Sequence, residues 1–142
     1  MHLIIDGYGA DYEKMQDVDL VYRFLDECPS SIGMTKITQP HVITYHGPKP
    51  EDWGVSGFVI IAESHISVHT FPERGYINID VFSCKEFDSE AAVQEIRGVF
   101  SLSEMKVWTL ERGLEYSEPD EALRIMNIER AKLLKGSAWN ND

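Results

Sequence analysis

The chain has few cysteines, few basic side chains and no long apolar run. Its 142 residues include two cysteines, too few for the disulfide framework of a small secreted protein. The net charge of −11 argues against nucleic acid as a partner, because phosphate binding needs clustered basic side chains. No apolar stretch approaches the ~20 residues that span a bilayer, and no secretory leader precedes the first apolar segment. We therefore expect a cytoplasmic protein with free thiols that binds neither nucleic acid nor a membrane.

The residues that are present suffice for one folded domain. Apolar residues make up 43% of the chain, with six Phe, six Tyr and three Trp. A chain of this length is most simply organised around one hydrophobic core. We expect the main domain over residues 1–116 and a C-terminal helical extension of the same domain over residues 117–142.

Hydrophobic periodicity predicts both helices and strands. Leu20, Phe24 and Cys28 recur at every fourth position, which is typical of the buried face of a helix. This position makes Cys28 a small core residue rather than a reactive thiol. Short segments rich in β-branched residues and bounded by Gly or Pro predict strands. The predicted helices cover residues 17–31, 88–100 and 118–135, and the predicted strands cover residues 2–6, 34–45, 54–63, 65–70, 76–84 and 105–110.

The ends and connections of these elements carry their own signals. Asp88 or Ser89 is expected to cap the second helix, and Ser117 the third, which Gly136 ends. Consecutive strands are joined by short turns, such as the one at residues 72–75, and such connections favour antiparallel pairing. The sequence therefore predicts an α+β fold, a two-layer sandwich in which helices pack on one face of an antiparallel sheet.

Reactive side chains gather directly after the most apolar predicted strand. Residues 62–73 read AESHISVHTFPE, and residues 80–84 read DVFSC. Because side chains alternate along a strand, His65, Ser67 and His69 share one face. A buried polar group without a partner costs ~1–3 kcal/mol, so a strand meant only for packing would avoid this composition. The face is therefore either solvated or a site, and its serine, histidine and carboxylate groups are those that covalent catalysis uses.

Two chemistries fit these residue types less well. His65 and His69 lie about 13 Å apart along a strand, too far to bind one zinc ion through bonds of about 2 Å, so no metal is expected. A hydrolase with a Ser-His-carboxylate triad fits the residue types, but the sequence lacks a Gly-x-Ser-x-Gly elbow.

The same segments resemble the self-cleavage motif of the bacterial and archaeal S-adenosylmethionine decarboxylase proenzymes. The resemblance rests on GVSG at residues 54–57, AESHISVHTFPE at residues 62–73 and DVFSC at residues 80–84, including the spacing of every reactive group. It extends from the first strand to about residues 112–113. The C-terminal helix lies outside it.

The resemblance implies that the chain cuts itself between Glu63 and Ser64. The Ser64 hydroxyl attacks the carbonyl of Glu63 and turns the peptide bond into an ester. A base, which the resemblance identifies as His69, then removes the Ser64 α-proton, so that the ester is eliminated. Hydrolysis leaves a pyruvoyl group. The products are a β-chain of residues 1–63 and an α-chain that begins at residue 64.

The resemblance also implies how the processed protein acts. The pyruvoyl group derived from Ser64 forms a Schiff base with a small amino-acid substrate and takes the place of pyridoxal phosphate, so that neither this cofactor nor a metal is expected. Cys84 is implied as the proton donor after carbon dioxide leaves, because a thiol is a suitable acid near neutral pH.

Further residues are implied around these groups. Ser56 is expected to support self-cleavage through a hydrogen bond, and a turn hydroxyl between glycines is an equal interpretation of it. Phe71 matches a position where the family has an aromatic that helps hold adenine. Tyr45 or Trp53 is expected to complete that clamp by stacking on the base. The remaining candidate site residues are His65 and Glu73.

The sequence also departs from the family pattern. Lys85 follows Cys84 where the family usually has glycine, and residues 45–54 form a longer and differently composed segment. Ser64 and His69 are an odd number of residues apart, so a regular strand would point them to opposite faces. We therefore expect a bend or bulge near the scissile bond, and a strained peptide there would favour the acyl shift.

Three functions are compatible with the sequence. The first is a pyruvoyl-dependent decarboxylase of S-adenosylmethionine that supplies aminopropyl groups for polyamine synthesis. The second is a pyruvoyl-dependent decarboxylase of ornithine or arginine on the same scaffold. The third is a non-catalytic homologue, against which the intact set of Ser64, His69 and Cys84 argues. Because the family pairs its protomers, the resemblance implies a homodimer of αβ protomers.

Overall fold

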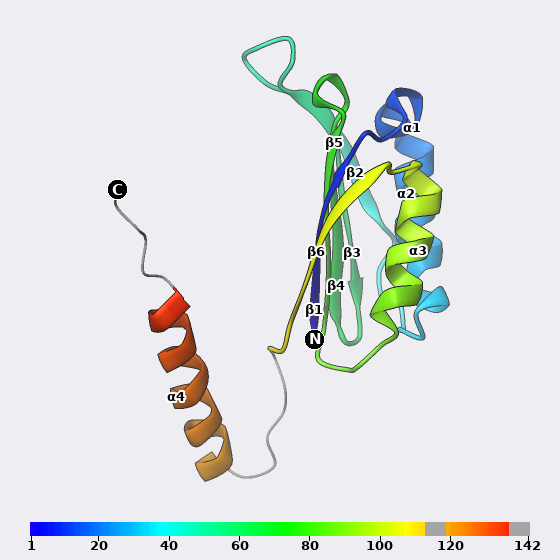
Figure 1. Ribbon diagram of the computed structural model, residues 1–142. Coiled ribbons are helices and arrows are strands. Elements are labelled where there is room, and N and C mark those ends of the chain that lie inside the picture. Colours follow the sequence, from blue (N-terminus) through cyan, green and yellow to red (C-terminus); the bar gives the residue numbers. More distant parts are fainter. Residues whose placement is uncertain (113–118, 137–142) are drawn as a thin grey trace, which may run out of the picture.

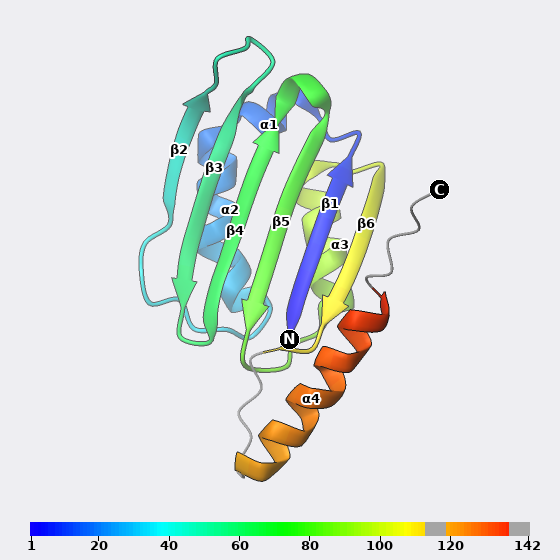
Figure 2. The ribbon, with the colours of Figure 1, turned by 90° about the vertical axis from the view of Figure 1, so that its left-hand side faces the viewer.

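Six strands form one antiparallel sheet in the order β2-β3-β4-β5-β1-β6 (Figure 2). The computed structural model describes residues 1–112 and 119–136. The strands are β1 (His2–Tyr8), β2 (His41–His46), β3 (Trp53–Ile61), β4 (Ser64–Phe71), β5 (Tyr76–Ser83) and β6 (Glu104–Leu110). The helices are α1 (Tyr12–Gln16), α2 (Val18–Ser31), α3 (Ser89–Phe100) and α4 (Pro119–Gly136), with one 3₁₀ turn at Pro72–Arg74.

The helices α1, α2 and α3 cover one face of the sheet, and the hydrophobic core lies between the two layers (Figure 1). Strand side chains that point to this side are fully buried and meet the apolar stripe of α2. Core residues of the sheet include Leu3, Ile5, Val59, Ile66, Val68, Ile77 and Ile79, and core residues of the helices include Val21, Phe24, Cys28, Ile96 and Phe100. The predicted two-layer α+β sandwich is confirmed.

Aspartate caps fix where the two long helices of this layer begin. The Asp17 carboxylate accepts the Leu20 backbone N–H at 3.0 Å, and the Asp88 carboxylate accepts the Ala91 N–H at 2.9 Å. Each bond satisfies an N–H that has no partner within the helix. Asp88, rather than Ser89, is therefore the cap of α3.

Several predicted boundaries differ from the structure. The strand predicted at residues 34–45 forms only from His41, because residues 34–38 run beside the end of β3 with a single isolated bridge, between Lys36 and Ile61. The strand predicted to reach Glu63 ends at Ile61, and β1 extends two residues further than predicted. The helix predicted at residues 118–135 is α4, and its predicted cap, Ser117, lies outside the described residues.

The other face of the sheet carries large apolar side chains in the open. Ile43 is 49% exposed, Phe58 44%, Trp108 45% and Leu110 49%. In Figure 1 α4 lies apart from the sheet on this side. We call this surface, made by the outward side chains of β1 to β6, the open face. Within the described residues, no helix is long and apolar enough to cross a membrane.

Candidate active site

The bond predicted to be cut lies in the tight turn between β3 and β4. Ile61 pairs with Ser64 across the hairpin, so Ala62 and Glu63 form a two-residue loop. The peptide bond between Glu63 and Ser64 is therefore the point at which the chain enters β4. Two-residue hairpin loops favour positive φ angles, and residues other than glycine adopt such angles only at a cost in free energy.

Ser64 has that unusual backbone conformation. Its φ angle is 153°, in a region that side-chain-bearing residues rarely adopt. Such a conformation costs about 1–3 kcal/mol and persists only where the surroundings hold it. The strained peptide predicted at this bond is confirmed. Of the bend or bulge predicted near the scissile bond, the structure has no bulge, because β4 pairs without interruption with both β3 and β5; the irregularity is the backbone angle of Ser64 in the turn.

The carbonyl of Glu63 is already polarised by a backbone donor. The N–H of Cys84 donates to the Glu63 carbonyl oxygen at 2.9 Å. An attack on this carbonyl places negative charge on the same oxygen, and a fixed N–H donor stabilises that charge. Cys84 therefore contacts the scissile bond through its backbone N–H, whatever its side chain does. Sequence reasoning missed this contact, because every residue other than proline has the same N–H.

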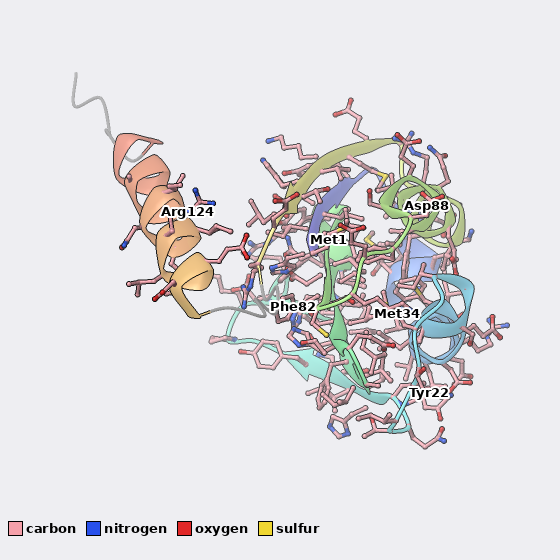
Figure 3. All side chains as sticks on the ribbon, turned by 90° about the horizontal axis from the view of Figure 1, so that it is seen from below. Met1, Tyr22, Met34, Phe82, Asp88 and Arg124 are labelled. Carbon is pink, nitrogen blue, oxygen red and sulfur yellow. The ribbon has the colours of Figure 1, made fainter. Side chains whose placement is uncertain are left out.

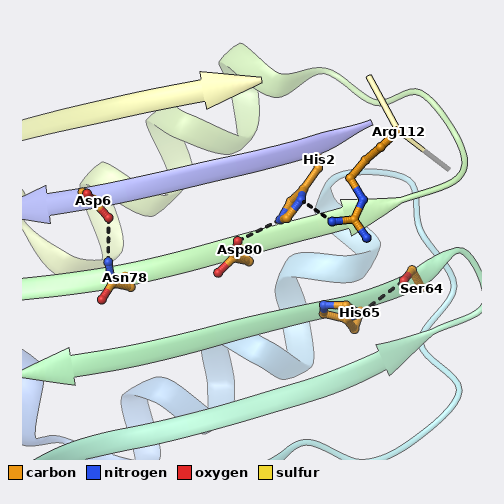
Figure 4. A network of polar contacts seen from close by, with 7 residues as sticks. All are labelled: His2, Asp6, Ser64, His65, Asn78, Asp80 and Arg112. Carbon is orange, nitrogen blue, oxygen red and sulfur yellow. Dashed lines mark hydrogen bonds and ion pairs between the residues drawn. The ribbon is translucent and has the colours of Figure 1, made fainter. Parts of the chain in front are cut away.

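The Ser64 hydroxyl lies beside an imidazole on the same strand. Its Oγ is 3.2 Å from Nδ1 of His65, within reach for proton transfer (Figure 4). The His65 ring meets Phe82 edge-on at 5.7 Å between ring centres, which orients it. Ser64 also pairs with Ser83, the residue before the exposed Cys84. The structure thus brings Ser64, His65 and Cys84 together at one end of the sheet.

Ser56 and His69 form a second polar pair, at a distance from the first. They are partners across the β3–β4 ladder, and the Ser56 Oγ is 3.0 Å from Nδ1 of His69. His69 is five residues along β4 from Ser64, which corresponds to about 16 Å in a regular strand. Within one chain, His69 therefore does not reach the α-proton of Ser64.

An aromatic pocket opens beside this second pair. It has a volume of about 230 Å³ and is lined by Tyr45, Pro48, Asp52, Trp53, Gly54, Ser56, Thr70 and Phe71. The three aromatic residues named from the sequence thus surround one cavity. Ser56 and His69 also line an adjacent hollow of about 300 Å³, on the open face between β2 and β4.

Glu73 holds the wall of the aromatic pocket. Its carboxylate accepts the indole N–H of Trp53 at 3.3 Å and the Tyr12 hydroxyl at 2.9 Å. The hydrogen bond to Glu73 raises the pKa of Tyr12 above its ordinary value. Glu73 therefore has a structural role next to the pocket. The contact from Tyr12 had no signal in the sequence, because α1 is too short for a helical pattern.

The two cysteines have opposite environments. Cys84 is exposed at the scissile turn, whereas Cys28 is fully buried in α2. Burial, with the nearby Glu95 carboxylate, raises the pKa of the Cys28 thiol to about 12. A thiol with this pKa is inert near neutral pH. The prediction that Cys28 is a core residue is confirmed.

Comparisons with known proteins point to one family. The family model described as S-adenosylmethionine decarboxylase matches residues 1–113. A curated S-adenosylmethionine decarboxylase proenzyme of Geobacillus kaustophilus is 32% identical over 121 residues, which are 85% of this chain and 93% of the relative. The proenzyme of Acidithiobacillus ferrooxidans is 35% identical over 112 residues, 78% of this chain and 80% of the relative.

A solved structure has the same fold. The crystal structure of the adenosylmethionine decarboxylase from Aquifex aeolicus superposes with a TM-score of 0.68 at 30% sequence identity. The match covers 82% of this chain and 92% of that protein. Fold and sequence therefore agree on the family.

Proposed function

Since the chain belongs to the S-adenosylmethionine decarboxylase family, we propose that it is the proenzyme of a pyruvoyl-dependent S-adenosylmethionine decarboxylase that supplies the aminopropyl donor for polyamine synthesis. The observation that carries the proposal is the strained Ser64, which follows a carbonyl held by the N–H of Cys84. The relatives compared above are named for S-adenosylmethionine and give no support to ornithine or arginine. The intact reactive groups argue against a non-catalytic homologue.

Self-cleavage uses groups that the turn holds. The Ser64 oxygen adds to the Glu63 carbonyl carbon, and the Cys84 N–H stabilises the oxygen that becomes negative. The C–N bond then breaks, the former peptide nitrogen leaves as an amine, and an ester joins the two residues. A base removes the α-proton of residue 64, and the Glu63 carboxylate departs. Water hydrolyses the remaining dehydroalanine with loss of ammonia, which leaves the pyruvoyl group.

Breaking the bond also removes the strain. The φ angle of Ser64 is constrained only while its nitrogen belongs to the turn. A ground state that is strained by about 1–3 kcal/mol is raised toward the transition state by up to that amount. The residues present thus fit a self-made pyruvoyl group at position 64.

After cleavage, the pyruvoyl group supplies an electron-accepting carbonyl for decarboxylation. Cys84 then acts as the proton donor. Its thiol is exposed, and its backbone N–H is hydrogen-bonded to Glu63, the residue before position 64. Cys28 has no such role, since it lies in the core. Its burial leaves Cys84 as the available thiol.

The aromatic pocket supports S-adenosylmethionine as the substrate; because it lies beside Ser56 and His69, it would serve Ser64 of a partner chain rather than Ser64 of its own. Tyr45, Trp53 and Phe71 line it, and flat aromatic rings stack on a purine base. Ornithine and arginine have no ring that such walls would hold. The Glu73 bond to Trp53 keeps one wall in place.

We further propose that two copies of the chain pair through the open face. In its own chain, His69 is about 16 Å from Ser64, so it acts as the base only if it comes from a partner. The exposed Ile43 and Phe58 lie beside His69 on the same face. A contact with two-fold symmetry would bury these residues in both copies. It would also bring Ser56 and His69 of one copy toward Ser64 of the other.

Intact mass and substrate assays test the proposal together. The purified protein should separate into fragments of residues 1–63 and 64–142, with the second fragment bearing a pyruvoyl group in place of serine. Carbon dioxide should then be released from S-adenosylmethionine and not from ornithine or arginine. A protein that stays at full length and still decarboxylates would overturn the pyruvoyl mechanism. Release from ornithine or arginine alone would overturn the substrate.

A further inference from the structure

A short segment runs beside the scissile turn and is bonded to it at several points. We call residues 33–38 the strap. The Thr35 carbonyl accepts the N–H of Ala62 at 2.8 Å, and the Ile37 N–H donates to the carbonyl of Ile60 at 3.1 Å. The strap thus continues the ladder of the sheet to the last residues before the turn.

One bond of the strap goes to the side chain of the residue that is cut. The Thr35 N–H donates to the Glu63 carboxylate at 3.1 Å. The Glu63 carbonyl, at the other end of the same residue, accepts the Cys84 N–H at 2.9 Å. Glu63 is therefore held from two sides, by the strap through its side chain and by the end of β5 through its carbonyl. One hydrogen bond is accepted by its carboxylate and the other by its carbonyl, and together they fix the orientation of Glu63.

The strap is itself anchored in the body of the molecule. Met34 is 6% exposed, and its sulfur receives the Ser83 hydroxyl at 3.6 Å. The Met34 N–H donates to the carbonyl of Pro29 at 2.7 Å, and the Lys36 ammonium pairs with Asp26 of α2. Figure 3, which views this end from below, shows Met34 on the helix-covered side of the sheet and Phe82 toward the open face. The strap therefore connects α2, β5 and the scissile turn.

We propose that the Glu63 side chain is a positioning residue for self-cleavage, which acts through the Thr35 N–H. The bond keeps the Glu63 carbonyl on the Cys84 N–H and thereby forces the irregular φ of 153° onto Ser64. Without it, the two-residue loop relaxes by turning Glu63, which moves the carbonyl away from its donor and relieves the strain. This inference rests on the self-cleavage proposed above.

The same bond has a consequence after the cut. The strap and Glu63 both belong to the β-chain, so their bond survives cleavage. The end of the β-chain stays in place, and residue 64 alone moves when the strain is released. Glu63 thus holds one of the two new chain ends in place: the carboxyl end of the β-chain remains next to Cys84, while the amino end of the α-chain becomes free to turn.

Cleavage rates of matched variants test this inference. Freshly synthesised precursor is followed by intact mass over time, for the wild type, Glu63→Gln, Glu63→Met, Thr35→Pro and Thr35→Ala. Gln keeps an acceptor oxygen at the same reach, and Met has similar length without one. Thr35→Pro removes the N–H donor but keeps the carbonyl, and Thr35→Ala keeps both. Circular dichroism checks that each precursor is folded.

The bond predicts a distinct pattern of rates. Glu63→Met and Thr35→Pro should each slow cleavage about 10-fold or more, whereas Glu63→Gln and Thr35→Ala should stay within about threefold of the wild type. The double variant Glu63→Met/Thr35→Pro should be no slower than the slower single variant, because both remove one bond. The pH profile of cleavage should keep its midpoint in Glu63→Met, since the carboxylate holds the turn and transfers no proton.

Each contrary result has one meaning. A Glu63→Met precursor that cleaves at the wild-type rate would overturn the inference while the proposed function stands. A Glu63→Gln precursor as slow as Glu63→Met, or a shifted pH profile, would mean that the charge acts directly and would also overturn it. A wild-type precursor that never cleaves would remove the proposed function, and the inference with it.

Discussion

β4 takes part in two serine–histidine pairs whose contacts are almost equal in length and whose surroundings are not. Ser64 lies 3.2 Å from His65, and Ser56 lies 3.0 Å from His69. The first pair stands at a strained strand end, next to a polarised carbonyl and an exposed thiol. The second stands on regular strands of the open face, beside an aromatic pocket.

The comparison shows that a serine–histidine contact does not by itself define a nucleophile. A hydroxyl attacks only where an electrophilic carbon is held within reach and the resulting charge is stabilised. The first pair has both, in the Glu63 carbonyl and the Cys84 N–H. Among the residues that the structure describes, the second pair has neither. Its chemistry therefore depends on what a partner brings to the open face.

Replacing each of the two serines by alanine should give the largest difference in cleavage. Ser64→Ala should abolish both cleavage and decarboxylation, because no hydroxyl remains to attack and no pyruvoyl group can form. Ser56→Ala should only slow cleavage, since it loses one supporting hydrogen bond. Intact mass after purification and carbon dioxide release measure both effects. Fragments in the Ser64→Ala protein would show that another residue cuts the chain.

Removing the thiol beside the first pair should affect turnover more than cleavage. Cys84→Ala keeps the backbone N–H that polarises the Glu63 carbonyl, so the chain should still cut itself. Turnover should fall by about 10²–10⁴, the usual contribution of a positioned acid. The pyruvoyl group should also be lost faster, because the proton more often goes to the wrong carbon. Equal turnover in Cys84→Ala and the wild type would mean that another group donates, with His65 the first to test.

The second pair can be tested by mixing chains. His69→Ala alone should cleave at least about 10²-fold more slowly, as expected for a lost base. If His69 acts across the interface, coexpression with the Ser64→Ala chain should restore cleavage of the His69→Ala chain, which then meets an intact His69 on its partner. Tags of different mass identify which chain is cut. Cleavage that is not restored, or that depends on His65 instead, would place the base within the same protomer.

The sequence predicted most of the elements and part of the site. Asp88 was predicted as a possible cap of α3, because caps are local signals, and the helix predicted from residue 17 begins at its cap, Asp17. The strands at residues 65–70 and 76–84 were predicted to pair through the short turn at residues 72–75, and the register that results pairs Ser64 with Ser83, the residue before Cys84. α1 was missed, because five residues carry too little periodicity.

The remainder of the site depends on contacts that leave no sequence pattern. Backbone donors such as the N–H groups of Thr35 and Cys84 are the same in every residue but proline. Residues 34–40 have a strand-like composition, but they pair with the end of β3 through a single isolated bridge, between Lys36 and Ile61, and the strand begins only at His41. The odd spacing of Ser64 and His69 predicted an irregularity, and the structure accommodates it in one backbone angle rather than in a bulge.

The smallest expected effect comes from the other cysteine, which extends the comparison to thiols. Cys28→Ala should leave cleavage and turnover unchanged and should lower the free energy of unfolding by about 1 kcal/mol at pH 7, because it removes a buried sulfur. The pKa of Cys28 is about 12 in the folded protein against 9.0 as its ordinary value. Between these pH values the unfolded chain has lost the proton that the folded chain keeps, so the contribution of Cys28 to stability falls as pH rises.

The stability difference between the wild type and Cys28→Ala should therefore shrink above about pH 9, by at most about 1.4 kcal/mol per pH unit, and should reach zero or change sign by about pH 10. Urea titrations of both proteins at pH 7, 9 and 10 measure this difference. In parallel, iodoacetamide at pH 8 should label Cys84 and leave Cys28 unreacted until urea unfolds the chain. A constant difference across this pH range, or rapid labelling of Cys28 in the folded protein, would show that its thiol is not held in the core, because a buried neutral thiol must follow both behaviours.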